Sequence, residues 1–246
     1  PARSAGGDRV SVDLRLGRWQ DVLADVECDV LISDPPYSAR VHEGQRTGSS
    51  TRKTTLNYAS LSESDVCDFV QRWVPRTRHW FVVFSDHAAQ AWWESALSDA
   101  GWYVFAPVIW LRTCPTPRLA GDGPTSACDY LTVARPRRKL ASERIGSRPG
   151  YYAIAGNDGR ENAHPGSKPI GAMRALVRDY SRPGDLICDP CAGSGTTLVA
   201  SAIEGRRAIG AEVDPDAYAI AARRVRGDEA RPRPEQPSLF ASLETP

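Results

Sequence analysis

The chain has no apolar run long enough to cross a membrane. Its longest runs, such as residues 80–84 and 103–111, fall well short of the roughly 18 residues that a membrane-spanning helix needs. Residues 1–13 are polar and contain no apolar stretch of the kind that precedes a signal-peptide cleavage site. With 41% hydrophobic and 25% charged residues among 246, the composition is typical of a globular protein. We therefore expect a cytoplasmic protein without a membrane partner.

A large excess of one charge sign is also missing, because the formal net charge is only +1. Any binding to nucleic acid would depend on local basic patches rather than on a wholly basic surface. One candidate patch lies in a Gly/Ser/Thr-rich segment and the other in a segment rich in Pro, Gly and Arg. Each could equally be an ordinary solvated loop. The basic residues that we take as candidates are Arg40, Arg46, Arg52, Lys53, Arg112, Arg118, Arg137 and Arg138.

Closely spaced cysteines are scarce as well. Of the six cysteines, only Cys188 and Cys191 form a Cys-x-x-Cys pair, which by itself would suggest a redox or zinc site. No second cysteine pair and no nearby histidine completes a zinc site. We therefore expect no bound metal.

Short apolar runs bounded by Gly, Pro, Asp or Arg alternate with longer stretches of helical pattern. This alternation is typical of a mostly parallel sheet covered by helices, so we predict an α/β fold with a seven-stranded sheet. Two of the middle strands follow one another without a clear helix, which favours an antiparallel strand at the sheet edge. The expected strands are 9–16, 29–33, 80–85, 102–111, 130–135, 186–189 and 207–212, and the expected helices are 63–74, 87–100, 169–181, 196–204 and 216–226.

The composition also divides the chain into regions. Residues 1–226 form one expected domain, within which the Pro-, Gly- and Arg-rich segment 112–165 is expected to be inserted loops around one strand. Residues 227–246 contain four prolines and are expected to be a flexible tail.

The first motif that carries chemistry is Asp34-Pro35-Pro36-Tyr37, which directly follows an expected strand. It therefore lies at a carboxyl end, where open α/β sheets bind ligands. The amino group of a nucleobase is a poor nucleophile because its lone pair is delocalised. The carboxylate of Asp34 and the carbonyl of Pro35 can accept its two hydrogens and aim the lone pair, while Tyr37 offers a face for stacking. An ordinary turn with a core tyrosine is the alternative.

The second motif is the segment 185–197, in which an expected strand runs through Gly193 and Gly195 into a helix. Glycines let the backbone approach a ligand closely, and helix N-terminal amides can meet a carboxylate. Glu212 ends the next expected strand, where a carboxylate can accept both hydroxyls of a ribose. The pattern indicates a nucleoside-binding unit, and the alternative, a dinucleotide site, has a different glycine spacing.

These motifs resemble the amino-group DNA methyltransferases, and their order, with the catalytic motif first, resembles the permuted beta class of that family. The element His164-Pro-Gly-Ser-Lys168-Pro is similar to that family's His-Pro-x-x-Lys-Pro. The resemblance implies a circularly permuted Rossmann-like methyltransferase fold, S-adenosylmethionine as cofactor, and a bacterial or phage-encoded protein. It implies that the target base is held by Asp34, Pro35, Pro36 and Tyr37, and the cofactor by Asp189, Pro190, Gly193, Ser194, Gly195, Thr196, Glu212, Lys168 and His164.

In two places the chain departs from the family pattern. Cys191 stands where the family usually has Phe or Tyr, so we interpret the Cys-x-x-Cys pair as a strand residue and a substituted pocket wall. Gly17-Arg18-Trp19 replaces the frequent Gly-Asp after the first strand, which leaves the contact to the cofactor's adenine unassigned.

The resulting hypothesis is a site-specific enzyme of the restriction–modification kind that methylates the N6 amino group of adenine in double-stranded DNA. It would flip the base out of the duplex and act by direct displacement. Asp34 favours adenine because cytosine enzymes of this class often carry Ser there. Methylation of cytosine N4 and a catalytically silent module that binds DNA and cofactor are the alternatives. The oligomeric state, monomer or homodimer, stays open.

Near the end of the chain, Gln236-Pro-Ser-Leu239-Phe240 resembles the short peptides by which bacterial DNA enzymes engage the replication sliding clamp. A flexible, proline-rich leader would suit that partner. A tail that folds back over an apolar groove is an equally good interpretation.

Overall fold

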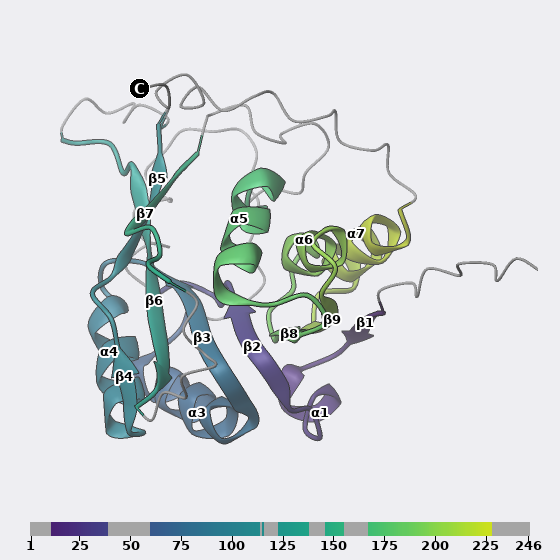
Figure 1. Cartoon of the computed structure of the whole chain (residues 1–246), viewed down its shortest axis with the longest axis horizontal. Coiled ribbons are helices and arrows are strands. Elements are labelled where there is room, and N and C mark those ends of the chain that lie inside the picture. Colours follow the sequence, from purple (N-terminus) through teal and green to yellow (C-terminus); the bar gives the residue numbers. More distant parts are fainter. Residues whose placement is uncertain are drawn as a thin grey trace, which may run out of the picture.

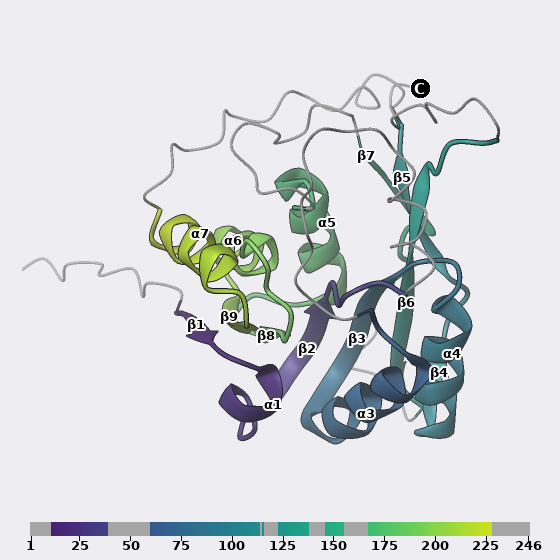
Figure 2. The ribbon, with the colours of Figure 1, turned by 180° about the vertical axis from the view of Figure 1, so that it is seen from behind.

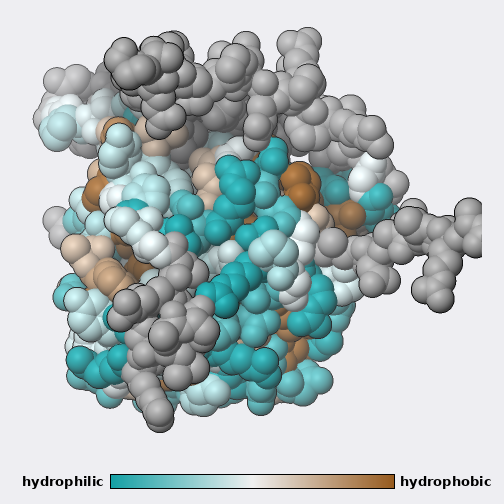
Figure 3. All heavy atoms as spheres, viewed as in Figure 1, coloured by the Kyte–Doolittle hydropathy of each residue, from teal (hydrophilic) through white to brown (hydrophobic). Residues whose placement is uncertain are grey.

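The computed structural model describes residues 11–38, 60–113, 115, 123–137, 146–154 and 167–227. Within these residues the chain forms one nine-stranded sheet with helices on both faces (Figures 1 and 2). None of the described helices is long and apolar enough to span a membrane. The face seen in Figure 3 is mostly hydrophilic, with hydrophobic residues in small separate spots.

One part of the sheet contains both motifs. The strands β1 (Val12–Leu16), β9 (Arg207–Glu212), β8 (Leu186–Asp189), β2 (Cys28–Ser33) and β3 (Thr77–Ser85) lie side by side in that order and are all parallel. From β8 the chain continues to β9 on one side, whereas from β2 it continues to β3 on the other. The order therefore reverses between β8 and β2, and such a switch point is where α/β sheets bind ligands.

The other part of the sheet corrects the predicted strand count and the place of the antiparallel strand. β6 (Cys128–Pro136) runs antiparallel to its neighbours β3, β4 (Trp102–Val104) and β5 (Val108–Arg112), and β7 (Tyr151–Ile154) lies beyond β5 and parallel to it. The sheet thus has nine strands rather than seven, and its antiparallel strand is internal rather than at the edge.

The two additional strands have separate origins. The predicted strand 102–111 is broken at Pro107, which has no N–H to donate to a ladder, so it becomes the separate strands β4 and β5. β7 is only four residues long and lies in a stretch whose Pro and Gly content suggested loops alone. Segment 112–165 therefore contributes two strands to the sheet rather than one.

Helices on one face form a core that is rich in aromatic residues. α1 (Trp19–Val22), α3 (Glu63–Trp73), the short helix η1 (Val74–Arg76) and α4 (Gln90–Asp99) lie on this side. α3 begins with a capping box between Ser62 and Asp65, which satisfies two backbone N–H groups at the helix start. Fully buried Trp73, Phe81 and Trp93 join α3 and α4 to β3.

The opposite face carries α5 (Ile170–Tyr180), α6 (Thr196–Ile203) and α7 (Pro215–Arg226). α5 packs on β2, β3 and β8 through an apolar stripe that includes Met173, Leu176 and Val177. Asp214 caps α7 with bonds to the N–H groups of residues 216 and 217, and Pro215 occupies the first turn, as the sequence predicts. This face brings α6 and α7 together next to the glycine motif.

Candidate active site

The two motifs lie next to each other at the carboxyl ends of β2 and β8. The strands pair in parallel with Leu31 opposite Cys188, and each motif follows its strand directly. The Ser33 hydroxyl donates a hydrogen bond of 2.8 Å to Asp189 Oδ1. The structure thus brings together segments that are 156 residues apart in the chain.

Lys168 lies on the catalytic motif. Its Nζ is 2.6 Å from Asp34 Oδ2 and 3.1 Å from the Tyr37 hydroxyl oxygen, and it lies 4.6 Å from the centre of the Phe84 ring. The side chains of Lys168 and Asp34 are 12% and 27% exposed, so the ion pair is largely withdrawn from water. The resemblance predicts Lys168 at the cofactor, and the structure places its ammonium on the Asp34 carboxylate.

In the described part of the chain, one carboxylate oxygen of Asp34 has no hydrogen-bond partner. Among the described residues no donor reaches Asp34 Oδ1, although that atom is buried. Burial raises the pKa of the Asp34 carboxyl, the Lys168 ammonium opposes this rise, and the neighbouring Asp129 carboxylate adds to it. Burial also raises the pKa of Tyr37 well above its ordinary value, which keeps the phenol protonated at neutral pH. The pair therefore offers a free acceptor beside a neutral aromatic hydroxyl.

Asp86 holds the loop that carries the catalytic motif. Its Oδ2 accepts a 2.8 Å bond from the N–H of Ser38, and its Oδ1 accepts bonds from the N–H groups of Ala88 and Ala89. Burial would raise the pKa of Asp86, but these N–H groups lower it overall. Sequence reasoning missed this residue, although its place directly after β3 was a usable signal.

The glycine motif forms a tight loop between β8 and α6. Gly193 and Gly195 have φ angles of +52° and +80°, which favour glycine over other residues. Glu212, 7% exposed, binds the loop: its Oε2 accepts a 2.7 Å bond from the N–H of Gly193, and its Oε1 accepts one from the N–H of Asp214. A Cβ added at Gly193 would meet no atom within 4 Å, so there is open space beside the loop.

The cysteine pair has no features of a reactive or metal-binding site. Burial raises the pKa of both Cys188 and Cys191 well above the ordinary value, whereas reactive thiols have a lowered pKa. In the part of the chain that the structure describes, no group of three or more His, Cys, Asp or Glu side chains is arranged to hold a metal ion. Asp189 follows Cys188 directly, and burial raises the pKa of its carboxyl to about 6.

Only two of the candidate DNA-binding residues are described, and they lie at opposite ends of β6. Arg112 is at the end of β5, where it pairs with Asp129 at 3.0 Å and donates to the carbonyl of Ser126 at 3.2 Å. Arg137 follows the other end of β6 and is exposed. The candidates that lie outside the described residues are His164, Arg40, Arg46, Arg52, Lys53, Arg118, Arg138 and the peptide Gln236–Phe240.

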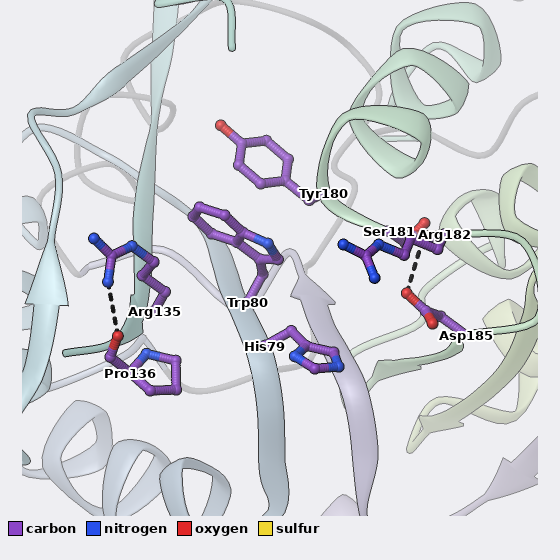
Figure 4. A pocket seen from close by; sticks show the side chains of 8 residues that line it. All are labelled: His79, Trp80, Arg135, Pro136, Tyr180, Ser181, Arg182 and Asp185. Atoms are coloured by element: carbon purple, nitrogen blue, oxygen red, sulfur yellow. Dashed lines mark hydrogen bonds between the residues drawn. The ribbon is translucent and has the colours of Figure 1, made fainter. Parts of the chain in front are cut away.

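A separate pocket lies at the amino ends of β3 and β8, away from the two motifs. The space within and in front of it is about 520 Å³, a volume that includes open solvent. Figure 4 shows Tyr180 next to Trp80, with Arg135 and Arg182 to either side. The centres of the Trp80 and Tyr180 rings are 5.3 Å apart, and the ring planes are inclined by 69°. Its one residue in common with the motifs is Asp185, the first residue of segment 185–197, which lies before β8 at the end opposite the glycine loop. The lining residues are His79, Trp80, Arg135, Pro136, Tyr180, Ser181, Arg182 and Asp185.

The N6/N4 methyltransferase family model, described as DNA methylase, matches residues 28–223 of this chain. The chain belongs to this family. The type II methyltransferase M.Cfr9I of Citrobacter freundii is 26% identical over 144 residues, which are 54% of this chain and 48% of that protein. The chain spans about half the length of the curated relatives that it matches.

Solved structures share the fold. M1.HpyAVI in complex with SAM (S-adenosylmethionine) aligns with a TM-score of 0.66 at 18% identity, covering 87% of this chain and 98% of that one. The PvuII DNA methyltransferase, described as cytosine-N4-specific, aligns with a TM-score of 0.63 at 17% identity, covering 87% of this chain and 86% of that one. The predicted Rossmann-like α/β fold is confirmed by these similarities.

Proposed function

We propose that this protein transfers a methyl group from S-adenosylmethionine to the exocyclic amino group of adenine in double-stranded DNA. The observation that carries the proposal is the buried Oδ1 of Asp34, which no donor among the described residues reaches, beside Tyr37 and adjacent to the glycine loop of the second motif. Membership of the DNA methylase family supports the class of reaction.

The residues of the second motif suit S-adenosylmethionine. The open space beside Gly193 leaves room for a ligand against the loop backbone, and Glu212 lies at the end of β9 with a carboxylate that can accept the ribose hydroxyls. Asp189, Pro190, Ser194, Gly195 and Thr196 would form the floor of this site. When bound, the cofactor supplies an electrophilic methyl group on a sulfonium.

The residues of the first motif prepare the nucleophile. Asp34 Oδ1 accepts one hydrogen of the base's amino group and the Pro35 carbonyl accepts the other, so that the nitrogen lone pair points toward the methyl donor. Pro36 stiffens the turn, and Tyr37 stacks on a base extruded from the duplex. Lys168 opposes the rise in the pKa of Asp34 and so favours its ionised form. The proton that the nitrogen loses passes to Asp34 or to solvent.

Cytosine N4 is the second candidate, because the same carboxylate and carbonyl can hold either amino group. The N4-specific PvuII enzyme shares the fold with this chain, which gives that alternative its support. Asp at position 34 favours adenine. The contacts to DNA would come from Arg112, which lies at the carboxyl end of the sheet as Asp34 does, together with the basic candidates outside the described residues.

The test is transfer of labelled methyl from S-adenosylmethionine to mixed-sequence duplex DNA, followed by mass spectrometry of the nucleosides. We expect 6-methyladenine from the wild type and a loss of about 100-fold or more in rate for Asp34→Ala, because a group that stabilises the reacting atoms is removed. Asp68→Ala changes an exposed carboxylate on α3 and is the matched control.

Each result decides between the candidates. A 4-methylcytosine product would replace adenine by cytosine as the target. Cofactor binding without transfer to any DNA would contradict the proposal and favour the silent module.

A further inference from the structure

Arg224, in the last turns of α7, binds the glycine loop through a single nitrogen. Its Nη1 lies 2.6 Å from the carbonyl oxygen of Ser194, 2.9 Å from the Ser194 hydroxyl and 3.0 Å from the hydroxyl of Thr196. All three contacts are partly buried. They join the end of one helix to the loop that opens another.

The loop depends on such outside contacts. α6 begins after Gly195, which has no side chain to cap the helix, so the usual Ser, Thr, Asp or Asn cap is missing. The peptide group between Ser194 and Gly195 is instead held from both sides: its carbonyl accepts from Arg224, and its N–H donates to the carbonyl of Ala192 at 2.7 Å. Its plane is therefore fixed.

The same loop reaches the catalytic side of the site. The Ser194 and Ser167 hydroxyl oxygens are 2.6 Å apart, and Ser167 directly precedes Lys168, the partner of Asp34. Arg224 thus holds a hydroxyl that links the loop to the strand-to-helix segment carrying Lys168. Displacement of Ser194 would loosen this link as well as the loop backbone.

We propose that Arg224 is a positioning residue for the cofactor: from the side of α7 it fixes the Ser194–Thr196 backbone in the shape that binds S-adenosylmethionine. This inference rests on the proposed cofactor and is independent of whether the target base is adenine or cytosine. Arg224 contacts the loop and not the reacting atoms. Its replacement should therefore weaken the affinity for the cofactor and leave the rate of the chemical step nearly unchanged.

The test is calorimetric titration of the full chain with S-adenosylmethionine in the absence of DNA. For Arg224→Met we expect the dissociation constant to rise about tenfold, because one or two net hydrogen bonds are lost. Arg224→Lys should recover most of the affinity, since an ammonium also donates to several oxygens. Arg223→Met changes the exposed neighbour on α7 and should bind like the wild type.

A kinetic measurement separates positioning from general support. In Arg224→Met the KM for S-adenosylmethionine should rise while kcat at saturating cofactor and the KM for DNA stay within about twofold. A matching loss of DNA affinity, or a loss that Arg224→Lys does not recover, would assign Arg224 to general stability and overturn the inference. If Arg224→Met bound the cofactor as tightly as the wild type, the inference about Arg224 would be overturned and the proposed function would stand. If the wild type itself did not bind the cofactor, the proposed function would be overturned too.

Discussion

Replacing Lys168 by Met should move the acid limb of the pH–rate profile to higher pH. In the proposed reaction Asp34 accepts a hydrogen from the target amino group, and it must be ionised to do so. Burial already raises the pKa of Asp34, and Lys168 is the charge that opposes this rise. Without the ammonium the pKa of Asp34 rises further. At a given acidic pH, a smaller fraction of the variant than of the wild type then has Asp34 ionised.

The magnitude follows from the geometry of the pair. Lys168 Nζ and Asp34 Oδ2 are 2.6 Å apart, and the two side chains are 12% and 27% exposed. A hydrogen bond between charged groups contributes about 1.5–3 kcal/mol. Because both side chains are partly exposed, we take about 2 kcal/mol for the Lys168–Asp34 pair. Since about 1.4 kcal/mol is a factor of ten, kcat/KM of Lys168→Met should be about 10- to 30-fold lower than that of the wild type at acidic pH. The difference should disappear at alkaline pH.

The assay is kcat/KM for methyl transfer measured across the pH range for the wild type and three variants. Lys168→Arg keeps the charge and should keep the limb close to that of the wild type. Asp129→Asn removes a carboxylate that raises the pKa of Asp34, so its limb should move in the opposite direction, to lower pH. A Lys168→Met profile that is lowered equally at every pH would refute control of Asp34 ionisation and return Lys168 to a role at the cofactor.

Two further predictions concern stability. Burial raises the pKa of Asp189 to about 6 from 3.8, so stability present below pH 4 is lost as the pH rises through 6, by up to about 3 kcal/mol. In urea unfolding, the free energy of unfolding of Asp189→Asn should not show this decrease with pH. The same pH dependence in Asp189→Asn and the wild type would contradict the prediction. Gly195→Ala should destabilise the fold by about 1–3 kcal/mol more than Gly227→Ala. Both glycines have similar φ angles, +80° and +79°, but only at Gly195 would the new Cβ lie 3.0 Å from the Cβ of Ala221; similar melting temperatures would contradict this.

The positions of the two motifs could be predicted because each depends on local sequence and one general rule. Asp34 and Asp189 follow short apolar runs, and the carboxyl ends of parallel strands meet at one edge of a sheet. The helix after Asp214 could be predicted because Asp-Pro is a strong start signal. These features need only the residues next to them in the chain.

The contacts that complete the site could not be predicted in this way. Lys168 and Asp34 are 134 residues apart, and Arg224 and Ser194 are 30 residues apart on different elements. Nothing in the local sequence of Lys168 separates an ion pair with Asp34 from a contact with a cofactor. Such pairings depend on how helices pack on the sheet, which the sequence pattern leaves open.

The order of the motifs along the chain matters less than the pairing of the strands that carry them. β2 and β8 are neighbours with Leu31 opposite Cys188, so the residues that follow them emerge side by side whichever strand comes first in sequence. The bond from Ser33 to Asp189 then fixes the distance between the two motifs. A permuted chain can therefore build the same site, because the parallel pair at the switch point, rather than the chain order, sets how closely the two motifs approach each other.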